Sequence, residues 1–147
     1  MTSALAAVPD AVLSAVLDRL LPGGDGWPGA RALGLDHAVR TQGKALPAQS
    51  AAAAAALAGL PTGFAMLPAP EQDAALRAQE VAMPDAFAAL VGAAYTAYYA
   101  DPRVHAAIAV KTGTPVRPPQ PDGHVLPAFD EALLAGVKAR GPLWRPL

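Results

Sequence analysis

The sequence predicts an all-α protein, a compact bundle of about six or seven short helices with a proline-rich extended arm before the last helix. Alanine, the best helix former, supplies 37 residues, whereas β-branched isoleucine occurs once. Sixteen prolines and 13 glycines divide the helices into short pieces. A hydrophobic fraction of 53% and a net charge of −1 argue against disorder. We therefore expect a single helical domain over residues 1–147.

Prolines and acidic residues mark the first helices. Pro9 and Asp10 suit the first turn of a helix that stops before the glycine-rich turn 22–26. Its apolar face is expected to be formed by Val12, Leu13, Val16, Leu17, Leu20 and Leu21, with Asp18 and Arg19 pointing away. A second helix is expected over 28–40, interrupted near Gly34. A third, over 47–60, contains six consecutive alanines, which should approach neighbouring backbones closely or lie on the surface.

The second half of the chain contains the strongest helical period. A helix from Pro70 to about Val81 precedes one that begins at Pro84. We expect the latter to be the core helix, because its apolar residues recur at helical spacing: Phe87, Leu90, Val91, Ala94 and Tyr98. Asp101 and Pro102 should start the next helix, which ends near Gly113. The arm, 114–127, follows. A last helix with the stripe Phe129, Leu133 and Val137 precedes the tail, 141–147.

Composition excludes several classes of function. Eleven basic residues are spread among 12 acidic ones without a basic run, which argues against nucleic-acid binding. The absence of cysteine excludes disulfides, thiol nucleophiles and iron–sulfur ligation. The longest apolar run, 51–60, is about half the length of a membrane span. Direct membrane insertion is therefore not expected.

No motif in the sequence indicates catalysis, a cofactor or a metal. Residues 111–113, Lys-Thr-Gly, match an element of serine β-lactamases, but no serine stands three residues before a lysine, so we interpret them as a helix end. Residues 23–26 lack the lysine and hydroxyl residue of a phosphate loop and are interpreted as a structural turn. The histidines, which are far apart in sequence, form no helical zinc pair: His37, His105 and His124.

Aromatic and arginine residues form the candidate site. Tyr95, Tyr98 and Tyr99 are spaced to lie on one side of their helix. They either pack in the core with hydroxyls reaching partners near the surface, or form a patch for another protein, since tyrosine, tryptophan and arginine dominate binding hot spots. Trp27 and Trp144 stand beside or near prolines, outside regular helices. Each is either pinned to the protein's own surface or available to a partner, and both interpretations stay open.

Several segments together resemble a known family. They are LLPGGDGWPGA at 20–30, the phenylalanine to glutamine segment 64–72, FAALVGAAYTAYYADPRV at 87–104, TGTPVRPPQPDG at 112–123 and ARGPLWR at 139–145. In this order they resemble the gluconate 2-dehydrogenase subunit 3 family, the small accessory subunits of FAD-dependent GMC-type oxidoreductases. The resemblance extends from about Ala11 to Arg145.

The resemblance implies a non-catalytic role in a hetero-oligomer. In such complexes the large subunit carries FAD and oxidises an alcohol or a sugar hydroxyl, and electrons pass to a haem subunit or another acceptor. The small subunit, which has no cofactor, supports the folding, stability and often the export of the large one. The residues expected to contact the partner are Trp27, Tyr95, Tyr98, Tyr99, Arg103, Arg117, Pro118, Pro119, His124, Trp144 and Arg145.

Export is where this chain departs from the family. Many members begin with a twin-arginine signal, whereas no basic residue precedes Arg19 here. The expectation is a cytoplasmic complex, or a periplasmic one if a signal has been removed. Two alternatives remain. One is a free-standing helical small-molecule binder or enzyme with a pocket lined by tyrosines and His105. The other is a module whose proline arm is recognised by an unrelated partner with an aromatic groove.

Overall fold

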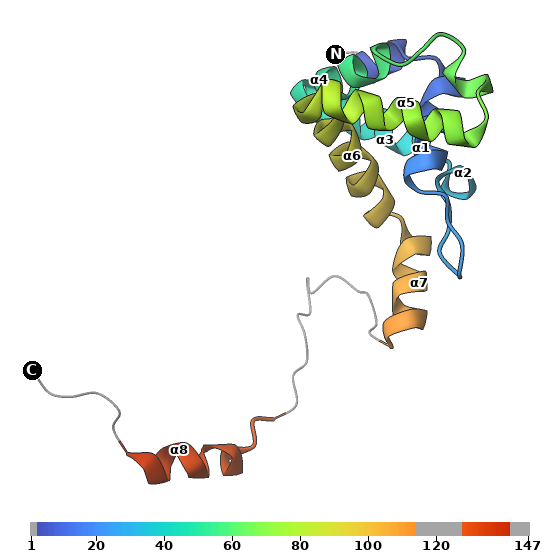
Figure 1. The fold of residues 1–147 in the computed structure, drawn as a ribbon. Helices are drawn as coiled ribbons and strands as arrows, with labels where there is room; N and C mark the ends of the chain where they lie inside the picture. Colours follow the sequence, from blue (N-terminus) through green and yellow to red (C-terminus); the bar gives the residue numbers. More distant parts are fainter. Residues whose placement is uncertain (1–2, 114–127, 142–147) are drawn as a thin grey trace, which may run out of the picture. The chain divides into compact units, whose positions relative to one another are not determined.

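A computed structural model of the chain describes residues 3–113 and 128–141 (Figure 1). Backbone contacts divide the chain into two units, Met1–Val116 and Arg117–Leu147. The described residues form eight α-helices and three short 3₁₀-helices, with no strand. The predicted all-α class is therefore confirmed. The arm, 114–127, and the tail from residue 142 onward lie outside the described residues.

The elements of the first unit follow the predicted order. They are η1 (Ala4–Ala7), α1 (Asp10–Leu20), α2 (Ala30–Leu33), α3 (Leu35–Ala45), α4 (Pro47–Ala58), η2 (Phe64–Met66), α5 (Ala69–Ala82), α6 (Pro84–Tyr99) and α7 (Pro102–Thr112). The predicted helix 28–40 is two helices, because Gly34 between them adopts a left-handed backbone with φ of 61°. The second of these continues to Ala45, beyond the predicted end.

The helix ends use the residues that the sequence suggested. Proline occupies the first turn of α4, α5, α6 and α7. Before α7, the Asp101 carboxylate accepts a hydrogen bond of 2.8 Å from the backbone N–H of Arg103 and caps the helix. After α7, Gly113 has a φ of 68° and ends the helix in the left-handed conformation. The interpretation of residues 111–113 as a helix end is confirmed.

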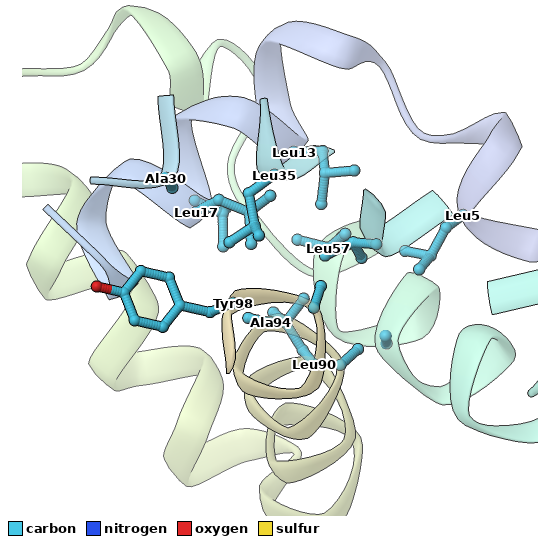
Figure 2. Packing of buried hydrophobic residues seen from close by; sticks show 14 of the residues in the cluster. Leu5, Leu13, Leu17, Ala30, Leu35, Leu57, Leu90, Ala94 and Tyr98 are labelled. Atoms are coloured by element: carbon cyan, nitrogen blue, oxygen red, sulfur yellow. The ribbon is translucent and has the colours of Figure 1, made fainter. Parts of the chain in front are cut away.

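The core is centred on α6, which packs against α4 more extensively than any other two described elements pack together. The stripe predicted for α6 faces inward, and Figure 2 shows Leu90, Ala94 and Tyr98 on the side of α6 that meets Leu17 and Leu57. Both helices bury small side chains: Ala53 and Ala56 on α4, and Ala93, Ala94 and Ala97 on α6. Part of the alanine run is thus buried in the core, whereas Ala51 and Ala55 are exposed.

The N-terminal segment is fixed by a small polar network. The Ser3 and Ser50 hydroxyls lie 2.5 Å apart, and the Ser50 hydroxyl also accepts a hydrogen bond of 3.2 Å from the backbone N–H of Leu5. Ser3 and Ser50 are only 5% and 1% exposed. Gly43 permits this close approach, since a Cβ at that position would lie 2.6 Å from the Ser3 hydroxyl. Arg40 donates to the carbonyls of Leu5 and Val8 and to the carboxylate of Asp10.

Asp18 and Arg19, which were expected to point away from the bundle, form ion pairs with neighbouring helices instead. Arg19 forms a two-pronged ion pair with Asp73 on α5, with both N–O distances at 2.7 Å. This pair lowers the pKa of the Asp73 carboxyl. Asp18 accepts a hydrogen bond of 2.9 Å from Arg31 on α2. The expectation was wrong because the positions opposite the apolar face of α1 adjoin α2 and α5, not only solvent.

The second unit contains η3 (Glu131–Leu134) and α8 (Ala135–Arg140). Asp130 caps its start by accepting a hydrogen bond of 2.9 Å from the backbone N–H of Ala132. Gly141, with a φ of 71°, follows its end. Phe129, Leu133 and Val137, the predicted stripe, are 65%, 72% and 58% exposed.

Candidate partner interface

Trp27 is presented by a tight turn between α1 and α2. The backbone N–H of Gly24 donates to the Trp27 carbonyl at 3.0 Å, and the Trp27 N–H donates to the Gly24 carbonyl at 2.9 Å. Asp25 and Gly26 between them have φ values of 51° and 83°. Positive φ at both central residues, with an Asp-Gly sequence, is typical of a two-residue type I′ hairpin turn. The interpretation of residues 23–26 as a structural turn is confirmed.

The Trp27 ring lies beside α7. The Lys111 ammonium is 5.5 Å from the ring centroid, which is the geometry of a cation–π contact. Trp27 is half-buried, so part of the ring is held on the protein's own surface and part is accessible. An open groove of about 660 Å³ adjoins it. The groove is lined by Asp25, Gly26, Trp27, Pro28, Arg103, Ala106, Ala107, Val110 and Lys111.

Tyr98 belongs to the core. It is 6% exposed, and its hydroxyl donates a hydrogen bond of 3.0 Å to the carbonyl of Pro28, next to Trp27. Burial, with a smaller contribution from Tyr99, raises the pKa of the Tyr98 phenol, so the group stays neutral and keeps its proton for this bond. Of the two interpretations, core packing with a hydroxyl that reaches a partner near the surface describes Tyr98. Tyr98 therefore supports the predicted contact surface through its bond to Pro28, and its own ring is buried.

Tyr95 and Tyr99 are different, because they are 47% and 52% exposed. Their ring centroids are 6.1 Å apart with an interplanar angle of 32°. The Tyr99 ring also meets Tyr98 edge-on, with centroids 5.3 Å apart. The carbonyl of Tyr99 lies 2.5 Å from Nε2 of His105 on α7. These contacts fix the two exposed rings on a buried support, an arrangement that costs little conformational entropy when a partner binds.

Arg103 connects α7 to the end of α2. Its guanidinium donates to the carbonyls of Ala32 and Leu33, both at 2.9 Å, and forms a two-pronged pair with Asp101 at 3.0 and 2.7 Å. The bond from Arg103 lowers the pKa of Asp101. Arg103 therefore satisfies the carbonyls that the short helix α2 leaves without intrahelical donors. Its side chain is still 57% exposed beside the groove.

The structure thus brings together five of the predicted contact residues through direct contacts or a shared groove: Trp27, Tyr95, Tyr98, Tyr99 and Arg103. It adds Val110, which is 86% exposed on α7 and was not predicted. The remaining predicted residues lie outside the described ones: Arg117, Pro118, Pro119, His124, Trp144 and Arg145. Their predicted roles stay predictions.

Three further observations concern metal ions, membrane spans and small-molecule pockets. Within residues 3–113 and 128–141, no three histidine, aspartate or glutamate side chains are grouped to hold a metal ion. No helix in this part of the chain combines the length and apolar character needed to cross a bilayer. None of five grooves on the described residues of the first unit is lined by a tyrosine or by His105, as the small-molecule alternative would require.

Comparisons with protein-family models, curated proteins and solved structures gave no match to this chain. The resemblance to the small-subunit family therefore remains a prediction carried by the sequence segments alone.

Proposed function

We propose that this chain is a non-catalytic accessory subunit that binds and stabilises a flavin-dependent alcohol or sugar dehydrogenase or oxidase. FAD and the catalytic residues belong to that large subunit. One observation carries the proposal: Tyr95 and Tyr99 are exposed on α6, and Val110 is exposed on α7 in the open groove that Trp27 borders. The family resemblance supplies the identity of the partner.

The exposed residue types suit protein binding. Tyrosine and tryptophan are enriched at the energetic centres of interfaces, where a large ring is desolvated and its polar atom finds a partner. Their support here is rigid, because the hairpin turn holds Trp27 and the buried Tyr98 ring backs Tyr99. A preorganised surface binds with a smaller entropic penalty.

The described groups with shifted pKa values have structural tasks. Asp73 and Arg19 join α5 to α1, and Asp101 and Arg103 hold the start of α7 against α2. Shifted groups facing a cleft often indicate catalysis, but ion pairs between helices shift pKa values in the same way. The arrangement of these carboxylates favours an interaction protein over an enzyme.

Co-purification tests the proposal. The tagged chain would be expressed with its neighbouring genes, and the visible spectrum of the eluted protein recorded. A stoichiometric yellow complex with flavin bands is expected. Val110→Asp should abolish it, since the carboxylate would be desolvated at the interface. Val81→Asp is the matched control, because Val81 is 83% exposed on α5, which does not line the Trp27 groove.

Two results would contradict the proposal. A colourless, folded monomer would remove the flavoprotein partner and move the small-molecule alternative to the front. Equal loss of complex with Val81→Asp and Val110→Asp would show that the surface of α7 has no particular role.

A further inference from the structure

The first unit contains a concave apolar pocket that is separate from the Trp27 groove. Its volume is about 380 Å³, and the two sites share no lining residue. The pocket is lined by segments that are distant in sequence: η1 and the two residues after it, the first turn of α1, the end of α4 and the loop 60–63. Small-molecule sites in proteins have volumes of about 300–1,000 Å³, so this pocket has the size of a ligand site.

Contacts behind the pocket hold its walls in place. Arg40 on α3 donates hydrogen bonds to the carbonyls of Leu5 and Val8, which fix the segment between η1 and α1. In the loop 60–63, the Pro61 carbonyl accepts a hydrogen bond of 3.0 Å from the backbone N–H of Phe64, whose ring is anchored in the core. The pocket is therefore preformed, and residues of the first unit alone set its shape.

The lining of the pocket is uncharged. None of its twelve residues carries a charge, and Thr62 is the only one whose side chain can form a hydrogen bond. An ion that entered would lose its hydration without gaining an ion pair, which is strongly unfavourable. The larger apolar side chains Val8, Val12 and Leu60 are only half-buried. An apolar ligand would complete their removal from water, which favours its binding.

We propose that this pocket binds a neutral aliphatic molecule of about 8–12 carbon atoms with at most one hydroxyl or carbonyl group, which would bond to Thr62. An apolar cavity of about 150 Å³ holds benzene, or about 25 Å³ for each carbon atom. At this ratio 380 Å³ corresponds to about 15 carbon atoms, and a pocket that opens to solvent holds fewer. The proposal concerns the chain itself and does not depend on a flavoprotein partner.

A protein partner fits this pocket less well than a small molecule. Protein interfaces of standard size involve roughly 20–30 residues on each side. The pocket offers twelve, and they form a hollow instead of a broad surface. A hollow of this kind surrounds a short chain of carbon atoms on several sides, as small-molecule sites do.

Methyl NMR of the full-length chain during a titration with 1-octanol tests the proposal. Saturable shift changes are expected for the methyl groups of Val8, Val12, Leu57 and Leu60. Sodium octanoate has the same number of carbon atoms but is ionised at pH 7. It should bind at least about tenfold more weakly than 1-octanol, because its carboxylate finds no pairing group in the pocket.

Two matched substitutions on α4 test the location of the site. Ala58 is exposed and lines the pocket, whereas Ala55 is exposed and does not line it. Ala58→Phe fills part of the pocket and should weaken 1-octanol binding by at least about tenfold, the effect of a single misplaced methylene in an apolar site. Ala55→Phe should leave the affinity unchanged. Circular dichroism checks that both variants are folded.

Several results would overturn the proposal. The pocket is not a ligand site if the four methyl resonances show no saturable change up to the solubility limit of 1-octanol. Equal weakening by Ala58→Phe and Ala55→Phe would place the binding elsewhere. Equal affinity for octanoate would refute the selection of a neutral ligand. Nuclear Overhauser contacts from another part of the chain to these methyl groups in the free protein would show that the chain fills its own pocket.

Discussion

Replacing Tyr98 with phenylalanine isolates the bond that supports the Trp27 turn. The ring would keep its place in the core, where Tyr98 is 6% exposed. Only the hydroxyl that donates to the Pro28 carbonyl at 3.0 Å would be lost. Because Pro28 follows Trp27 directly, this bond ties the candidate interface to α6. Tyr98→Phe therefore tests whether the turn is held by the buried helix.

The expected cost follows from the environment of the bond. A neutral hydrogen bond contributes about 0.5–1.5 kcal/mol, and a buried acceptor left without a partner costs about 1–3 kcal/mol. The bond is only partly buried, so water can replace the hydroxyl in part. We expect Tyr98→Phe to lower the free energy of unfolding by about 1 kcal/mol, within the range for a lost neutral bond.

Urea denaturation followed by circular dichroism and tryptophan fluorescence measures this loss. Tyr95→Phe is the control, because Tyr95 is 47% exposed and its change should stay within about 0.5 kcal/mol. If the two variants lose equal stability, the bond from Tyr98 does not hold the turn and the reasoning is refuted.

The same variant has a signature at high pH. Burial raises the pKa of Tyr98 in the folded protein, whereas the same phenol in the unfolded chain has a pKa of about 10. The stabilising contribution is therefore fully present below pH 10 and is lost as the pH rises through the folded pKa. Stability measured from pH 8 to 11 should fall more steeply for the wild-type protein than for Tyr98→Phe.

Two further predictions concern the frame of the bundle. Ser50→Ala removes the acceptor of the Leu5 N–H and the partner of the buried Ser3 hydroxyl, so it should lower the free energy of unfolding, measured by urea denaturation, by about 1–3 kcal/mol. Ser3→Ala should lower it by less, because the bond between Ser50 and Leu5 remains. Arg103 lowers the pKa of Asp101 in the folded state. The contribution of this carboxylate to the free energy of unfolding is therefore present above its unfolded pKa, about 3.9, and is lost as the pH falls from there through the folded pKa. Asp101→Asn keeps a capping side chain without the charge, so its stability deficit should shrink between pH 5 and 2, and a constant deficit would contradict the assigned ion pair.

Local signals predicted the helices well. Prolines at 47, 84 and 102 stand in the first turns of α4, α6 and α7, as expected, because a fixed φ and a missing N–H act within a few residues. The period of α6 identified the core helix for the same reason: one face of a helix is defined by its own sequence. The left-handed glycine at 34 likewise marked the break between α2 and α3.

Contacts between distant segments could not be read in this way. The acceptors of Arg103 are carbonyls near residue 32, and carbonyls carry no sequence signal. Arg19 and Asp73 are 54 residues apart, and many such pairs could be drawn from the sequence. The polar network around Ser50 was not predicted either. Gly43 in α3 and Ser50 in α4 are poor helix formers within helices, and such residues can indicate a close contact.

The tyrosines show where periodicity reaches its limit. A spacing of three and four residues places Tyr95, Tyr98 and Tyr99 on the same side of α6, yet the boundary between core and surface runs between them. That boundary depends on the position of the Trp27 turn and α7, which the pattern within α6 does not contain.

The buried alanines of α4 and α6 have a consequence for how this sequence can vary. Ala53, Ala56, Ala93, Ala94 and Ala97 are buried in the core, and their side chains have no rotamers to reorganise. A larger residue at any of these positions has to displace its neighbours in the core, and a glycine weakens the helix. Most core positions exchange one aliphatic residue for another during evolution, but these five have almost no neutral substitution. A survey of mutational tolerance along the chain should therefore find its strictest positions among its smallest side chains.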